Sequence, residues 1–122
     1  MGKKAKKVEI PKNPLPNEIG EIIIEMGIDW AYDYNWEEWA YSKRVEELRL
    51  KSADELKRLY RETSDKISQI KKSEAFEIGG GLAFKMCINE LSRLRKHLLR
   101  IIFLLIEREE EFLPDLDVLD LN

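Results

Sequence analysis

Three consecutive glycines, at positions 79–81, separate two long stretches in which apolar residues recur every three or four positions. That spacing is the period of an amphipathic α-helix, and glycine adopts the left-handed and extended conformations that end one. The first stretch opens with Ser52 and Glu55, the hydroxyl and carboxylate of a capping box. The second runs from about Leu82 to about Glu111. The sequence therefore predicts two long antiparallel helices that meet at the glycines.

Each predicted helix has one apolar face. On the first helix this face holds Leu56, Leu59, Tyr60, Thr63, Ile67 and Ile70. On the second it holds Cys87 or Ile88, followed by Leu91, Leu94, Leu98, Ile101 and Leu105. Such alternating three- and four-residue steps form the seam of an antiparallel two-helix coil. We expect an all-α fold built on a helical hairpin at 47–111, with an extended N-terminal arm and a short acidic C-terminal tail.

The second helix carries more apolar surface than its partner can cover. Between residues 98 and 106 it is apolar nearly all round, and a two-helix hairpin cannot bury every side. Either the segment at 18–42 folds back over this surface or another protein covers it. The candidate residues for such a protein interface are Trp36, Trp39, Leu99, Ile102, Phe103 and Ile106.

The hairpin is flanked by segments of different composition. Residues 1–17 contain five lysines, one acid and three prolines, which predicts an extended basic arm that is either unstructured or follows phosphates. Residues 18–46 are acidic and rich in aromatic residues, with a short helix predicted at 18–26. Because the acids repel phosphate, we expect this segment to pack on protein rather than to stack on bases. Residues 112–122 form an acidic tail that is either unstructured or docks on a partner.

Charge is distributed unevenly along the chain. The net charge is −3, yet residues 43–106 hold fifteen basic and nine acidic side chains, and residues 107–122 hold one basic and seven acidic. A basic body between acidic flanks is the layout expected of a hairpin that faces RNA while its flanks meet proteins. A solvated helix surface with intrahelical ion pairs explains the same cations without a partner. The cations that can contact phosphates are Lys51, Arg58, Lys66, Arg93, Arg95, Lys96 and Arg100.

The sequence holds no recognisable catalytic constellation. One histidine and one cysteine are too few for a zinc site or an intrachain disulfide, and His97 is expected to be a surface histidine in a basic patch. The longest apolar run has nine residues, which is too short to span a bilayer, and no secretory signal or mitochondrial presequence is visible. We expect no enzyme activity, cofactor, metal, small-molecule substrate or membrane span.

Both ends of the hairpin resemble the ribosomal protein L-29 family, whose members are helical hairpins on large-subunit rRNA. The family's opening, Glu/Asp-Leu-Arg-x-Lys-Ser-x-x-Glu/Asp-Leu, is matched by residues 47–56. Its close, Arg-Arg/Lys-x-Ile-x-Arg-Ile followed by Leu and Glu-Arg-Glu, is matched by residues 95–109 with Leu98 in place of the first isoleucine. The segment 56–60 looks closer to the mitochondrial branch than to the bacterial one. The turn departs from the family, because Gly79-Gly80-Gly81-Leu82-Ala83 replaces the bacterial Gly-x-Leu-Glu-Asn.

This resemblance implies a structural constituent of the large ribosomal subunit that binds rRNA near the polypeptide exit region, beside a neighbouring ribosomal protein. It implies a mitochondrial ribosome, with a cytoplasmic one as the alternative. It adds Arg49 to the candidate rRNA contacts and supports Lys51, Arg95, Lys96 and Arg100. The alternative function is a non-ribosomal helical adaptor that joins proteins through the apolar surface at 98–106 and the acidic tails.

Overall fold

The computed structural model describes residues 4–120 and is all-α, as predicted. Residues 1–3 of the predicted arm and 121–122 of the predicted tail lie outside the described residues. Within the described part, the elements in chain order are α1 (Pro16–Met26), the 3-10 turn η1 (Asp29–Ala31), α2 (Trp36–Ala40), α3 (Lys43–Arg49), α4 (Ala53–Lys71), α5 (Glu74–Ile78), α6 (Gly81–Glu107) and α7 (Leu116–Leu119). No helix among the described residues is long and apolar enough to cross a membrane.

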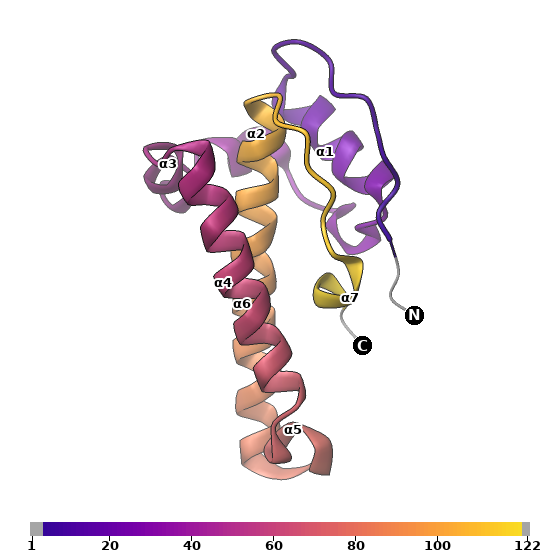
Figure 1. Cartoon of the computed structure of the whole chain (residues 1–122), viewed down its shortest axis with the longest axis vertical. Coiled ribbons are helices and arrows are strands. Elements are labelled where there is room, and N and C mark those ends of the chain that lie inside the picture. The colour runs from indigo at the N-terminus through magenta and orange to yellow at the C-terminus, as the bar shows by residue number, and fades with distance from the viewer. Residues whose placement is uncertain (1–3, 121–122) are drawn as a thin grey trace.

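The predicted hairpin is the long α4–α6 pair, whose two helices run side by side along the molecule (Figure 1). The hydroxyl half of the predicted capping box is confirmed, because the Ser52 hydroxyl accepts a hydrogen bond from the Glu55 amide at 3.2 Å, while the Glu55 carboxylate lies 3.4 Å from that hydroxyl. The predicted junction is wrong in detail. The first helix ends at Lys71, and the short helix α5 lies between it and the glycines. A new cap at Ser73 starts α5, and Gly79 ends it with a left-handed φ of 74°.

The fold is more than a hairpin, because the acidic aromatic segment packs on the second half of α6. Helix α1 ends at Gly27 as predicted and, with α2, covers one side of α6 (Figure 1). The Trp36 ring stacks on Phe103 with 5.9 Å between ring centroids and 8° between planes. Gly20 makes room for this ring, since a Cβ there would lie 2.2 Å from it. The segment at 18–42 thus folds back, which is the first of the two alternatives.

The predicted protein interface is therefore mostly core. Trp36 is 6% exposed, and the four α6 residues Leu99, Ile102, Phe103 and Ile106 are fully buried. Only Trp39 remains half-buried, with its ring stacked on Tyr34 at 4.8 Å between centroids. The assignment of these buried residues to a partner was wrong because the chain supplies its own cover, which removes their apolar surface from water.

The C-terminal tail is folded against the hairpin. Three side chains donate hydrogen bonds to consecutive carbonyl oxygens around the end of α7: Lys71 to Asp117 at 2.9 Å, Arg95 to Val118 at 3.2 Å and Trp30 to Leu119 at 3.0 Å. These carbonyls lie where a helix end leaves acceptors without intrahelical partners. Helix α7 is thereby fixed to α4, to α6 and to the 3-10 turn at once.

The N-terminal arm is extended, as predicted, and lies along the outside of α1 (Figure 1). Its half-buried apolar side chains, Ala5, Val8 and Ile10, pack against the core. The Lys6 amide donates to the Met26 carbonyl at 3.2 Å, and Lys4 forms an isolated antiparallel bridge with Asp115. The described parts of the arm and the tail therefore belong to the folded structure.

Candidate nucleic-acid interface

Arg49, a candidate rRNA contact, is used inside the protein. Its guanidinium binds the Glu107 carboxylate at two points, with Nε 2.9 Å from Oε1 and one terminal nitrogen 3.1 Å from Oε2. The same side chain donates to the Ala40 carbonyl at 2.8 Å and pairs with Glu46. These contacts tie α3 to the C-terminal end of α6. Hydrogen bonding to Glu107 raises the pKa of Arg49, so this charge is engaged within the fold, which argues against its assignment to RNA.

Arg95 is buried, which also argues against its assignment to RNA. It is 4% exposed, and its Nε donates to the Val118 carbonyl. Burial lowers its pKa, which the negative charge of Asp120 partly offsets. A guanidinium enclosed between α6 and α7 cannot reach a phosphate outside, so the role of Arg95 is to hold the C-terminal segment.

Two further candidates form ion pairs on the surface of their own helices. Arg58 pairs with Glu62 at 3.1 Å along α4, and Arg93 pairs with Glu90 along α6, with Nε 3.1 Å from Oε2. Both arginines are exposed. Exposed pairs of this kind contribute about 0.3–0.5 kcal/mol each and open easily. Arg58 and Arg93 can therefore turn to a phosphate at small cost.

The remaining candidates are Lys51, Lys66, Lys96 and Arg100. Lys51 is half-buried at the turn between α3 and α4, and Lys66 and Lys96 are exposed on α4 and α6. The Arg100 guanidinium lies over the Trp39 ring, 5.2 Å from its centroid, in a cation–π contact. Burial and the charge of Arg44 lower the pKa of Arg100.

A surface hollow lies at the junction of α3 and α6, and Lys51 is one of the residues that line it. The hollow has a volume of about 560 Å³ and is lined by Arg44, Glu47, Leu48, Lys51 and His97. We call it the α3–α6 hollow. Among residues 4–120, no ion pair joins Arg44, Lys51 or Arg100 to a carboxylate within 4.0 Å. With two cations, Arg44 and Lys51, against the single carboxylate of Glu47, the lining has a net positive charge, which attracts anions.

His97 reports the electrostatics of this region. The side chain is half-buried, and burial is the largest cause that lowers its pKa. Four cations lower it further: Arg100 and Arg93 on α6, Lys66 on α4 and Arg44 on α3. Because three helices contribute, the positive potential comes from the tertiary fold and not from one helix face.

Sequence reasoning missed Arg44 and the position of His97 in this hollow. Arg44 stands on a short helix that was not predicted, although Ser42 precedes it as an N-cap residue type and Val45 and Leu48 are spaced for one buried face. His97 was expected in a basic patch, but only the packing of α3 on α6 turns that patch into a hollow.

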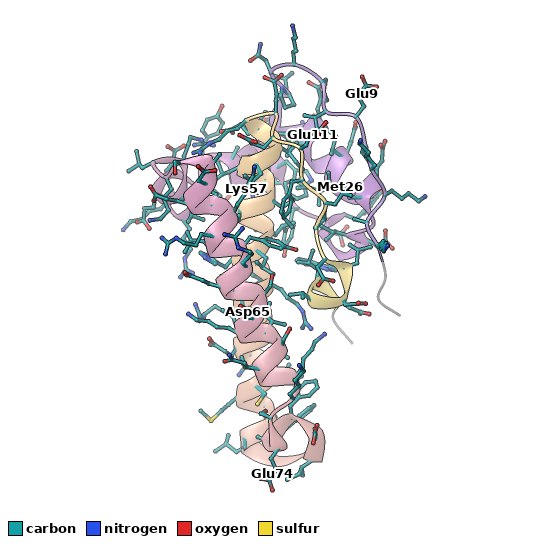
Figure 2. The ribbon with its side chains drawn as sticks, viewed as in Figure 1. Glu9, Met26, Lys57, Asp65, Glu74 and Glu111 are labelled. Carbon is teal, nitrogen blue, oxygen red and sulfur yellow. The ribbon has the colours of Figure 1, made fainter. Side chains whose placement is uncertain are left out.

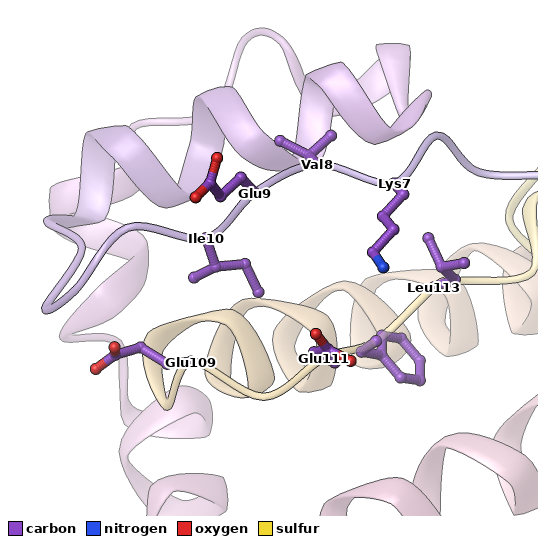
Figure 3. A pocket seen from close by; sticks show the side chains of 8 residues that line it. Lys7, Val8, Glu9, Ile10, Glu109, Glu111 and Leu113 are labelled. Carbon is purple, nitrogen blue, oxygen red and sulfur yellow. The ribbon is translucent and has the colours of Figure 1, made fainter.

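Two other surfaces are prominent. A groove of about 760 Å³ lies between the N-terminal arm and residues 109–113, and Lys7, Glu9, Glu109 and Glu111 mix both charges along it (Figure 3). At the far end of the hairpin, which Glu74 marks in Figure 2, Ile78, Leu82 and Met86 are 71%, 75% and 64% exposed. We call these three residues the apolar tip.

Among the described residues there is no group of three or more histidine, cysteine, aspartate or glutamate side chains placed to hold a metal ion. Comparisons with protein-family models, with curated proteins and with solved structures found no match for this chain. The resemblance of 47–56 and 95–109 to the L-29 family accordingly remains a prediction from short motifs.

Proposed function

We propose that this protein is a non-enzymatic RNA-binding component of the large ribosomal subunit, which contacts rRNA through the cations around the α3–α6 hollow. The observation that supports it is the gathering of Arg44, Lys51, His97 and Arg100 from separate elements with no described carboxylate paired to the three permanent charges. Double-stranded RNA is recognised through its shape, its phosphates and its hydroxyls, so spaced cations on rigid helices suffice.

The proposed contact set differs from the sequence-based one. Arg49 and Arg95 leave it because they bind Glu107 and Val118 inside the fold. Lys51, Lys66, Lys96 and Arg100 remain as direct contacts, and Arg44 and His97 join them. Arg58 and Arg93 take part once their ion pairs open.

Sedimentation tests the proposal. The tagged protein, expressed in its native cells, is run through a sucrose gradient at moderately high salt. Co-migration with large-subunit rRNA is expected, and the identity of that rRNA decides between a mitochondrial and a cytoplasmic ribosome. A protein found only at the top of the gradient, free of rRNA, would overturn the proposal.

Charge reversal at exposed positions sharpens this test. Lys51→Glu combined with Lys96→Glu is expected to remove the protein from the subunit peak, because Lys51 lines the hollow and Lys96 is an exposed candidate contact next to His97 in the chain. Lys43→Glu combined with Lys72→Glu is the control of equal charge change, since both lysines are exposed and neither lines the hollow. Equal loss from both pairs would show that net charge alone governs association.

The second candidate function is a protein adaptor, which the apolar tip favours. Three large apolar side chains at the end of the hairpin are exposed to water, which is unfavourable for apolar surface. Such patches are typical of protein contact surfaces. Affinity capture after ribonuclease treatment tests this function. A stoichiometric protein complex that survives ribonuclease and is lost in Leu82→Ser with Met86→Ser would support the adaptor.

A further inference from the structure

We propose that the α3–α6 hollow is a binding site for one phosphate group of an RNA backbone, with Arg44, Lys51 and His97 as its donors. This inference rests on the proposed function and deepens it, since it names the side chains that would hold one phosphate of the RNA. It assigns a ligand-binding role to the single histidine of the chain.

The donors come from three places that the fold brings together. Arg44 stands on α3, Lys51 stands in the turn that follows α3, and His97 projects from α6 into the same hollow. Leu48, only 7% exposed, forms an apolar part of the lining. Ionic hydrogen bonds beside an apolar wall are stronger than those in open water, because the local dielectric constant is lower.

The free site carries unfavourable charge that a phosphate would relieve. Arg44 lies close enough to both His97 and Arg100 to lower the pKa of each. The packing of α3 on α6 thus holds like charges near one another, at a cost to the stability of the free protein. A bound phosphate reverses this repulsion, since each cation then interacts with the anion.

Glu47 is the one acidic side chain among the residues that line the hollow. Its carboxylate opposes a phosphate, and it limits the affinity of the site. Removing its charge by Glu47→Gln is therefore expected to strengthen binding of phosphate. A gain in affinity distinguishes a direct effect on the site from damage to the fold, because a damaged fold does not bind more tightly.

Proton uptake is expected on binding. The groups facing His97 are Arg93 and Arg100 on its own helix, Lys66 on α4, Arg44 and Glu47 on α3, and Lys51 in the turn. Burial, and then the cations, lower the pKa of His97 in the free protein, which favours the neutral imidazole. A phosphate placed between them favours the protonated ring, which offers two N–H donors instead of one. Binding is thus expected to strengthen as pH falls, up to about tenfold for each unit by which the phosphate raises the histidine pKa.

The single histidine makes the test direct. Its imidazole carbon-bound proton is followed by NMR through a pH titration of the full chain, alone, with a short RNA duplex and with inorganic phosphate. The duplex is expected to raise the His97 pKa and to shift its resonance at constant pH. Inorganic phosphate is expected to do so only weakly, because it lacks the neighbouring backbone phosphates that Lys66 and Lys96 can contact.

Affinity measurements on matched variants complete the test. Lys51→Gln is expected to weaken duplex binding about tenfold. It is also expected to reduce the slope of log affinity against log salt concentration by about one. His97→Gln is expected to remove the gain in affinity between pH 7.5 and 5.5. Lys43→Gln, an exposed lysine on α3 that does not line the hollow, is the control and is expected to change the affinity less than twofold.

The possible failures are distinguishable. A wild-type chain that does not bind the duplex at low salt overturns the proposed function itself. Duplex binding with an unchanged His97 titration, and with Lys51→Gln equal to Lys43→Gln, overturns the phosphate site while RNA binding stands. A His97 shift caused by inorganic phosphate and not by the duplex overturns the assignment to an RNA backbone.

Discussion

The Nε atom of Arg95 lies 3.2 Å from the carbonyl oxygen of Val118, so a side chain from the middle of the longest helix clamps the C-terminal segment. Lys71 and Trp30 complete the clamp by donating to the carbonyls of Asp117 and Leu119. Arg95 and Lys71 thus both serve the fold, although each carries a positive charge. Cations that donate to backbone carbonyls in this way have a structural role, and they differ from the exposed cations that a ligand can reach.

Arg95→Met is expected to destabilise the protein by about 1.5–3 kcal/mol, because a hydrogen bond from a charged donor is lost and the Val118 carbonyl is left without this partner. Methionine retains an apolar stem, so the change isolates the polar contact. Urea unfolding measures the free energy, and hydrogen exchange of residues 116–120 reports release of α7. The neighbouring exposed Lys96→Met is the control, expected to change stability by less than about 0.5 kcal/mol. Equal stability of both variants would contradict the clamp.

Gly20→Ala is expected to destabilise the fold by about 1–3 kcal/mol through overpacking against the Trp36 ring. In an open helix the same change stabilises by up to about 1 kcal/mol, so the sign itself is diagnostic. Gly80→Ala, at the extended residue that precedes α6, is the control for an added methyl group that meets no atom within 4 Å. Thermal unfolding followed by circular dichroism compares the two. A stabilised Gly20→Ala would show that α2 does not pack closely on α1.

The sequence predicts the long helices well, because their signals are local. Apolar periodicity, the Ser52 cap and the breaks at Gly27 and Gly79 each depend on a few neighbouring residues. The position of α3 on α6 depends on contacts between residues far apart in the chain, such as Arg49 with Glu107, which are 58 positions apart. No period or cap encodes such a contact, so the hollow it creates was not foreseen.

The roles of the candidate site residues also depend on long-range contacts that the sequence does not reveal. A stripe of cations at helical spacing shows which side chains share a face, and it does not show which of them another element will cover. Arg95 and Arg100 are five positions apart, yet one is enclosed by α7 and the other lies over Trp39. Residues close in the sequence therefore differ in role because of elements distant in the chain.

Arg49→Lys is expected to cost about 1 kcal/mol of stability, because lysine cannot bind the Glu107 carboxylate at two points as the planar guanidinium does. The pair is partly exposed, which keeps the effect modest. Arg58→Lys, in the exposed intrahelical pair with Glu62, is the control and is expected to be near neutral. Urea unfolding at low and high salt measures both. A cost for Arg58→Lys as large as that for Arg49→Lys would contradict the special role of the α3–α6 contact.

Tyr60 is expected to make the protein less stable in alkali. Its hydroxyl, buried between α4 and the C-terminal segment, accepts from the Asp115 amide at 2.8 Å, and burial raises its pKa to about 12 although that hydrogen bond lowers it. The folded state therefore keeps the proton between pH 10 and about 12, where the unfolded chain releases it. The raised pKa of Tyr60 contributes about 2–3 kcal/mol to the free energy of unfolding. This contribution is complete below pH 10 and is lost as pH rises through this window. Urea midpoints at pH 9, 10 and 11 should fall more steeply for the wild type than for Tyr60→Phe, and parallel curves would contradict the burial of this hydroxyl.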